Sequence, residues 1–133
     1  MSMQLARQHF ETKLASGLPS GVNVTYAGFS GAINTPEVLV SFPAVQSFQA
    51  SFGSPGTNMT RNVTVVFLEL YVDGGAGTTA AYGYADTLMT LFRNATLSES
   101  YRCGIPYKQG ERSDEPYFIV TIAVPLQWDE FNA

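Results

Sequence analysis

Residues 117–126 form an apolar run that limits the choice of fold more than any other part of the sequence. Because side chains alternate along a β-strand, Phe118, Val120 and Ile122 would lie on one face, with Ile119 on the other. A strand that is apolar on both faces needs cover on both and is unsuited to the edge of a sheet. We therefore expect this run to be a central strand.

A second strong strand pattern covers residues 60–72, where β-branched and aromatic residues are interspersed with polar ones. Residues 45–52 alternate as a strand does, and residues 53–58 between the two runs have turn composition, which predicts a long antiparallel hairpin. Shorter strands are expected at residues 22–26, 37–42 and 101–107, with the most charged loop of the chain at residues 108–115.

Two segments have the four-residue spacing of amphipathic helices. The first covers residues 2–18, and the second runs from about residue 79 to about residue 93, with Thr78 as a suitable N-cap. Their apolar stripes consist of Ala6, Phe10 and Leu14 in the first helix and Ala81, Ala85, Leu88 and Phe92 in the second.

The order of these elements is helix, several strands, helix and two further strands, without regular βαβ alternation. It predicts an α+β fold: an antiparallel or mixed sheet of about five to six strands with two helices packed on one face. A chain of 133 residues is near the commonest domain size, so residues 1–133 are expected to form a single domain.

Only 14% of the residues are charged, below the roughly one quarter usual in soluble domains. Uncharged polar residues are abundant instead, as on surfaces pressed against neighbouring subunits or in threonine-rich antiparallel sheets, and both interpretations stay open. The net charge of -4 and the seven dispersed Lys and Arg residues argue against sequence-specific nucleic-acid binding, although a ring of subunits could focus a few of them.

Cys103 is the only cysteine, so no disulfide can form within the chain, and a reducing compartment is expected. No apolar run approaches the roughly twenty residues of a membrane span, and residues 1–10 are polar, unlike a signal peptide. We therefore expect no membrane association, and synthesis and assembly in the cytoplasm.

The segment Asp73-Gly74-Gly75-Ala76-Gly77-Thr78-Thr79 follows a strong strand and precedes a helix, a position where backbone N–H groups can bind phosphate. Its glycines match neither the phosphate-loop nor the dinucleotide-binding spacing. A flexible loop, or one that contacts other subunits, is the preferred interpretation. The alternative is a small ligand-binding or enzymatic domain that uses residues 73–79.

No catalytic residue, metal ligand set or cofactor site is identified. His9 is the only histidine, and it lies within the first expected helix, where a surface role is the more usual one. Carboxylates could hold Mg²⁺ or Ca²⁺ weakly, but solvated or interface carboxylates are the preferred interpretation. These carboxylates are Asp73, Glu111, Asp114 and Glu115.

Aromatic residues of the kind that fill protein interfaces are frequent, at 13% of the chain. Trp128 lies beyond the expected last strand, in the segment Gln127-Trp128-Asp129-Glu130-Phe131. This tail is expected either to fold back on its own sheet or to dock on a neighbour.

Several segments carry a resemblance to small phage and prophage tail proteins. They are Val65-Val66-Phe67-Leu68-Glu69-Leu70-Tyr71-Val72, Gly74-Gly75-Ala76-Gly77, Ala85-Asp86-Thr87-Leu88, Leu91-Phe92, Phe118-Ile119-Val120-Thr121-Ile122-Ala123-Val124-Pro125-Leu126, and the opening helix with Phe10 and Leu14. The chain resembles a bacteriophage-related domain of unknown function that is similar to the tail terminators of long-tailed phages. Residues 27–58 resemble that group least.

The resemblance implies a structural protein of the virion tail and not an enzyme. It would form a homo-oligomeric ring, expected to be hexameric, that caps the tail tube, ends its polymerisation and presents a surface to a head-completion or connector protein. The expected partners are therefore further copies of the chain, the tail-tube protein and the connector, with assembly in the host bacterial cytoplasm. The alternative within the same class is another neck component, such as a head-closure or head-tail joining protein.

A ring requires two different, complementary patches on each subunit. We expect the charged segment 108–115 and the glycine-rich segment to contribute to them, because both have exposed composition and flank the strongest strands. The candidate interface residues are Asp73, Gly74, Gly75, Gly77, Thr78, Lys108, Glu111, Arg112, Asp114, Glu115 and Trp128.

Overall fold

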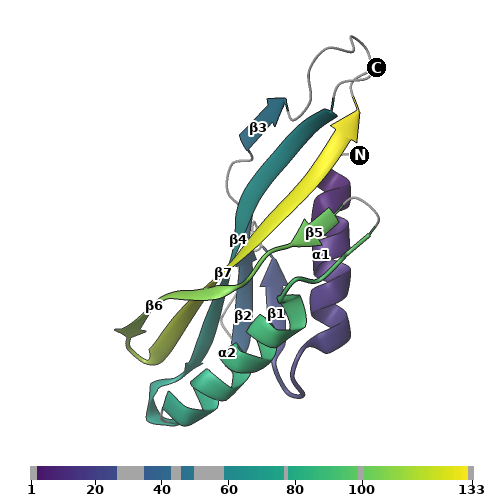
Figure 1. Ribbon diagram of the computed structural model, residues 1–133. Coiled ribbons are helices and arrows are strands. Elements are labelled where there is room, and N and C mark those ends of the chain that lie inside the picture. Colours follow the sequence, from purple (N-terminus) through teal and green to yellow (C-terminus); the bar gives the residue numbers. More distant parts are fainter. Residues whose placement is uncertain are drawn as a thin grey trace.

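The computed structural model describes residues 3–26, 35–42, 46–49, 59–76, 78–98 and 101–131. These residues form a mixed β-sheet with two helices on one of its faces (Figure 1). In chain order the elements are α1 (Met3–Gly17), β1 (Asn23–Tyr26), β2 (Glu37–Ser41), β3 (Gln46–Gln49), β4 (Met59–Asp73), the short 3₁₀ helix η1 (Gly74–Ala76), α2 (Thr78–Phe92), β5 (Tyr101–Cys103), β6 (Tyr107–Asp114) and β7 (Tyr117–Phe131).

The sheet is built around β4 and β7, which pair antiparallel along their full length, from Met59 opposite Phe131 to Asp73 opposite Tyr117. The strand order is β1-β2-β4-β7-β5, with β3 also paired to β4 and β6 also paired to β7. The pairing of β1 with β2 is parallel, and the other strand pairs are antiparallel. The expected α+β class, mixed sheet, one-sided helix layer and central position of the terminal strand are confirmed.

The sheet has seven strands within the described residues, rather than about five to six, because residues 101–115 fold differently from the prediction. The single strand expected at residues 101–107 is divided into β5 and the start of β6 by Gly104-Ile105-Pro106. The prediction of a charged loop at residues 108–115 was wrong, because most of this segment belongs to the strand β6, which is paired with β7 from Tyr107 to Asp114. Its side chains are nearly all exposed, so it lacks the apolar alternation that marks a half-buried strand.

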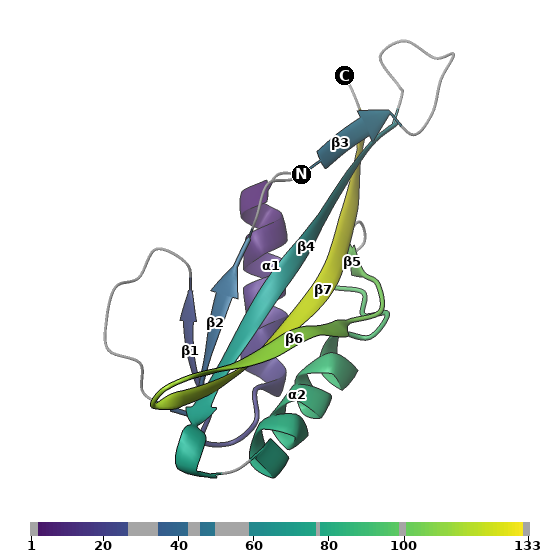
Figure 2. The same ribbon diagram turned by 90° about the vertical axis from the view of Figure 1, so that its left-hand side faces the viewer.

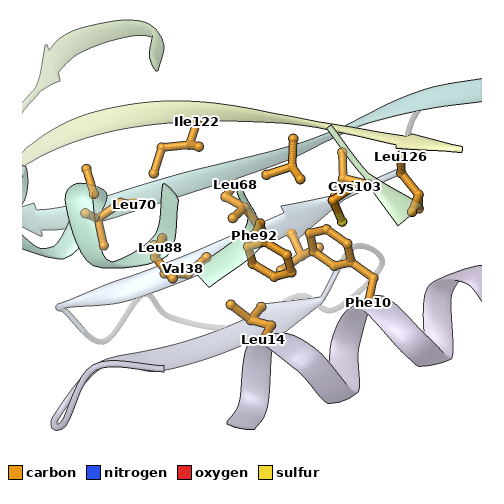
Figure 3. Close-up of a cluster of buried hydrophobic side chains, with 14 of the residues drawn as sticks. Phe10, Leu14, Val38, Leu68, Leu70, Leu88, Phe92, Cys103, Ile122 and Leu126 are labelled. Atoms are coloured by element: carbon orange, nitrogen blue, oxygen red, sulfur yellow. The ribbon is translucent and has the colours of Figure 1, made fainter. Parts of the chain in front are cut away.

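One face of the sheet carries the core. Along β4 the even-numbered side chains from Asn62 to Val72 are buried, while the odd-numbered ones keep partial exposure. The even-numbered side chains of β7 from Phe118 to Trp128 lie in the same apolar cluster as the two helices. Both predicted helical stripes are confirmed, because all seven of their residues are buried in that cluster. Figure 3 shows side chains from the two helices and from the strands converging there.

Aromatic contacts join the helices to each other and to the end of β2. The rings of Phe10 and Phe92 stack with centroids 4.4 Å apart and planes 5° from parallel, and Phe42 packs edge-on against Phe10 at 5.6 Å. The helices also approach closely at Gly17, where a Cβ would lie 2.4 Å from Leu91 Cδ1. Glycine at the end of α1 therefore leaves room for α2.

The predicted hairpin of residues 45–52 and 60–72 is confirmed in its described part, where β3 pairs with residues 60–63 of β4. Residues 43–45 and 50–58 lie outside the described residues. The expected strands at residues 22–26 and 37–42 are present as β1 and β2. Neither described helix has the length and apolar character needed to cross a membrane.

The segment after residue 126 folds back on its own sheet, as one of the two expectations held. It continues β7 to Phe131, and Trp128 is only 2% exposed, with its ring 5.7 Å from that of Tyr101. The choice of Trp128 as an interface candidate was therefore wrong for the folded subunit, because its side chain is buried there. The physical reason is that β5 pairs with this part of β7 and places Tyr101 directly opposite Trp128.

Candidate interaction surface

The face of the sheet opposite the helices is the helix-free face, formed by the odd-numbered residues of β4 and β7. Val63, Val65 and Phe67 on this face are only partly buried, although they are apolar and lie near the middle of β4. Register places Val65 opposite Pro125 and Phe67 opposite Ala123. Figure 2 views the molecule with α1 behind the sheet, and the paired β4 and β7 run diagonally across it.

A hollow of about 590 Å³ opens on the helix-free face, and we call it the sheet hollow. Its lining is mainly apolar, with two polar side chains of appreciable length. The side chains that line the hollow include Val63, Val65, Phe67, Pro125, Arg102 and Gln127. Apolar concavities of about 300–1,000 Å³ with few polar groups are typical of binding sites.

Exposed apolar side chains continue beside the sheet hollow, on the connection from β5 to β6. Gly104 lines the hollow, and its backbone N–H donates to the Pro125 carbonyl at 2.9 Å. The next residues along the chain include Ile105, which is 62% exposed, and Tyr107, which is 49% exposed and pairs with Ala123. Together they extend the apolar surface toward the edge of the sheet.

An ion pair lies at each end of the apolar stretch on β4. At one end Arg61 donates to Asp129 through Nε at 2.9 Å and through Nη2 at 3.3 Å. At the other end Arg112 Nη2 donates to Glu69 Oε2 at 3.1 Å. Both pairs are partly exposed, so each contributes little to stability. An apolar centre with a polar rim is the usual arrangement of a protein interface.

Arg102 stands apart from these pairs at the rim of the sheet hollow. It lies on β5 opposite Gln127, its side chain is exposed, and it belongs to no ion pair within the described residues. A guanidinium in this position is free to pair with a carboxylate from outside the chain, and its planar donors suit carboxylates well.

The candidate residues of the two predicted segments meet at one end of the molecule. The turn between β6 and β7 consists of Glu115 and Pro116, and with Asp114 it forms what we call the hairpin tip. Gly74 N donates to the Pro116 carbonyl at 2.9 Å, and a Cβ on Gly74 would lie 3.0 Å from that oxygen. Asp73 and Asp114 both pair with Tyr117 in register. The glycine at 74 thus permits a close approach between the two segments.

The remaining glycine-rich candidates contribute less to this end. Gly75 N donates to Asp73 Oδ1 at 3.0 Å, which closes a local turn at the end of β4. Thr78 is exposed and is the first residue of α2. Gly77 lies outside the described residues. The phosphate-binding interpretation gains no support from the sheet hollow, because none of the described residues among 73–79 lines it.

Three charged candidates on β6 have partners within the same chain. Tyr82 Oη donates to Glu111 Oε2 at 2.6 Å, and Lys108 Nζ donates to Glu111 Oε1 at 3.3 Å while lying 5.5 Å from the centre of the Tyr82 ring. The Tyr82 hydrogen bond lowers the pKa of the Glu111 carboxyl below its ordinary value and raises the pKa of the Tyr82 hydroxyl. Lys108 and Glu111 therefore fasten β6 to α2, while Arg112 pairs with Glu69.

The hairpin tip keeps its negative charge without such partners. Among the described residues, no ion pair includes Asp73, Asp114 or Glu115, and all three are exposed. Of the sequence-predicted charges, these carboxylates are the ones left available for another molecule.

The described residues contain no group of three His, Cys, Asp or Glu side chains placed to hold a metal ion. Burial raises the pKa of the Cys103 thiol to about 12, despite the opposing effect of Lys13, so the thiol is protonated at neutral pH. A protonated thiol is a poor nucleophile and a poor metal ligand. The ring of His9 lies 4.9 Å from that of Tyr101, in contact with its own chain.

The sheet hollow and Arg102 were absent from the sequence-based candidates. A signal for them exists, because Val63, Val65 and Phe67 are apolar on the face of residues 60–72 opposite Leu68 and Leu70. A strand apolar on both faces, with helices enough to cover only one, leaves one apolar face uncovered. The pattern predicts a strong strand, but it does not show what covers the second face of that strand.

Comparison with known proteins establishes the fold. The sequence matches no protein-family model and no curated protein. A solved structure whose name is only a sequence identifier is similar to this chain over 96% of each of the two chains, with a TM-score of 0.66 and 17% sequence identity. At that identity the likeness shows a shared α+β fold over nearly the whole chain.

Proposed function

We propose that this protein is a structural subunit of a phage tail that assembles with copies of itself into a ring and caps the tail tube as a terminator. The ring ends tube polymerisation and offers its opposite surface to a head-completion or connector protein. The resemblance of the sequence to tail terminators supplies the identity of the assembly. The observation that carries the assembly role is the helix-free face, with its apolar hollow between two ion pairs.

This surface is suited to a protein partner. The sheet hollow is flanked by Arg61–Asp129 at one end and Arg112–Glu69 at the other, so a partner seated there would exclude water from an apolar centre and leave a polar rim. The neighbouring Ile105 and Tyr107 enlarge the apolar area that a partner would cover. Apolar patches of this kind on soluble proteins mark interaction sites.

The fold also offers two different surfaces, as a closed ring of identical subunits needs. One is the sheet hollow with Arg102, which has no ion pair within the described residues, and the other is the acidic hairpin tip. A heterologous contact between unlike surfaces propagates from copy to copy and closes when the rotation per subunit divides a full turn. An isologous dimer would instead use the same patch twice.

The test combines the protein with purified tail tubes and measures both association and tube length. We expect sedimentation to show a monomer or weak oligomer when the protein is dilute. Electron microscopy should then show rings confined to tube ends, and tube elongation should stop. Val65→Thr, which preserves the shape of the hollow floor, should behave like the wild type, whereas Val65→Asp should leave tubes uncapped.

Two results would refute the proposal. A tight permanent dimer that forms no ring in the presence of tubes would exclude the terminator role. Binding to DNA-filled heads that lack tails, with no binding to tube ends, would identify a neck component on the head side instead.

A further inference from the structure

We infer that the hairpin tip of one copy seats in the sheet hollow of another copy, with the tip carboxylates facing Arg102. This contact rests on the proposed ring and names the surfaces through which its neighbours would meet. The two features that would meet have opposite charge, and each also presents apolar surface. The fold places them far apart on one subunit.

The charge of the two features is complementary. Arg102 is an exposed cation at the rim of the hollow with no ion pair among the described residues. The hairpin tip presents Asp114 and Glu115, with Asp73 beside them, and these three carboxylates also have no ion pair within the described part of the chain. Within the described residues, each copy therefore carries a cation without an ion pair in a concave site and carboxylates without ion pairs on an exposed turn.

The shapes agree with the charges. The β6–β7 turn lies at the left of Figure 1, at an end of the sheet where β4 is also paired with β7 as far as Tyr117. At its apex lies Pro116, an exposed apolar ring next to Glu115. The hollow has an apolar floor of Val63, Val65 and Pro125 and a cation at its rim. The proline would bury apolar surface against that floor while a carboxylate reaches the guanidinium.

The tip cannot occupy the hollow of its own chain. The tip adjoins Tyr117 at one end of β7, and the hollow is centred near Pro125 on the same strand, opposite Val65. Eight residues of extended strand separate these positions by about 26 Å, at about 3.3 Å per residue. A tip in a hollow is therefore a contact between copies, and its two halves are different patches of the subunit.

A charge-reversal cycle tests the pairing. Arg102→Glu and Glu115→Arg should each weaken association between copies about five- to tenfold in sedimentation velocity, since a rim ion pair becomes a repulsion. The double variant should recover most of the wild-type affinity. Asp86→Arg makes the same charge change on an exposed residue of α2, on the other side of the sheet, and should neither weaken the wild type nor rescue Arg102→Glu.

A disulfide trap tests the geometry independently of affinity. Val65→Cys combined with Glu115→Cys should form crosslinks between copies on mild oxidation, because a bridge within one chain is excluded by the separation of about 26 Å, against the roughly 7 Å limit between Cα atoms. The matched control combines Val65→Cys with Asp86→Cys. The native Cys103 is buried but also lines the hollow, so variants that carry Cys103 and only one introduced cysteine measure its background.

The outcomes separate this contact from the proposed function. A ladder of crosslinked species, with charge rescue, supports the contact and a propagating assembly. Crosslinked dimers alone support the contact and refute the ring. Rings that cap tubes without crosslinks or rescue refute the contact and leave the terminator role standing. A well-folded double-cysteine variant that stays monomeric under oxidation at high concentration overturns the contact.

Discussion

The stacked rings of Phe10 and Phe92 should hold the two helices together, and their contribution can be measured. Phe10 is fully buried, parallel to Phe92 with centroids 4.4 Å apart, and in edge contact with Phe42. Phe10→Ala removes a buried aromatic side chain and should lower the free energy of unfolding by about 3–5 kcal/mol. That is a large part of the roughly 5–15 kcal/mol that stabilises a typical domain.

The stack itself can be separated from simple burial. Phe10→Leu keeps most of the apolar volume. Apart from the loss of the aromatic contact itself, it should lower the free energy of unfolding by less than about 1.5 kcal/mol. In a double-mutant cycle of Phe10→Ala and Phe92→Ala, we expect a coupling free energy of about 0.5–1.5 kcal/mol. The assay is urea unfolding followed by circular dichroism at 222 nm, with the slope of each transition compared between variants.

The control for this cycle combines Phe10→Ala with Phe118→Ala. Phe118 packs edge-on against Tyr82 at 6.4 Å, and Tyr82 lies ten residues before Phe92 on α2, about 15 Å along the helix axis. Effects at that distance should add within about 0.5 kcal/mol. If the Phe10–Phe92 coupling is no larger than that of the control, the stacking does not stabilise the helix pair and the reasoning is refuted.

Three further predictions follow from single contacts. The hydrogen bond from Tyr82 lowers the pKa of the Glu111 carboxyl, so the stabilisation from this bond is fully present above the ordinary carboxyl pKa of 4.5 and is lost as pH falls through the lower pKa of the folded state. Tyr82→Phe should therefore reduce the loss of melting temperature at acid pH, and an unchanged pH profile of melting would contradict the contact. Burial raises the thiol pKa of Cys103 from 9.0 to about 12, so iodoacetamide at pH 8 should alkylate this thiol at least about a thousandfold more slowly in the folded protein than in the unfolded chain. Mass spectrometry measures the alkylation rates, and comparable rates for the two states would refute the burial. Arg112→Gln should cost no more than about 1 kcal/mol in urea unfolding, since its pair with Glu69 is half-exposed, and a larger loss would mean that Arg112 has a further role in the fold.

The helices and central strands could be predicted because their residues are buried in periodic patterns. Phe10 and Leu14 lie one turn apart on the buried stripe of α1, and Ile119 and Ile122 are buried on opposite faces of β7. Burial imposes a period on the sequence, and that period is visible without coordinates. The α+β class follows from the order of such patterns along the chain.

The strand β6 could not be predicted from periodicity, because its side chains are exposed on both faces. What fixes it is backbone pairing with β7, from Tyr107 to Asp114, which leaves no trace in side-chain character. The burial of Trp128 is likewise a consequence of pairing, since β5 comes to lie beside the end of β7. Long-range pairing of this kind depends on the assembled sheet and not on local sequence.

The candidate surface was predictable only in part. The sequence indicated that Asp114 and Glu115 are exposed charges, and at the hairpin tip neither forms an ion pair with another described residue. It gave equal weight to Lys108 and Glu111, which bind each other, because a list of charges cannot tell which ones already have partners. Arg102 became a candidate only when the sheet placed it beside the hollow.

The full-length pairing of β4 with β7 has a consequence for when the protein can act. Residues that face each other in this pairing are far apart along the chain, so α2, β5 and β6 are all synthesised before the first contact between the two strands can form. Closing so long a loop is entropically costly, and it makes formation of the sheet a late event in folding. The floor of the sheet hollow comes from this pairing, with Val63 and Val65 on β4 and Pro125 on β7. A nascent chain therefore has no hollow to offer until β7 has left the ribosome, which keeps half-made subunits out of any assembly that recognises that surface.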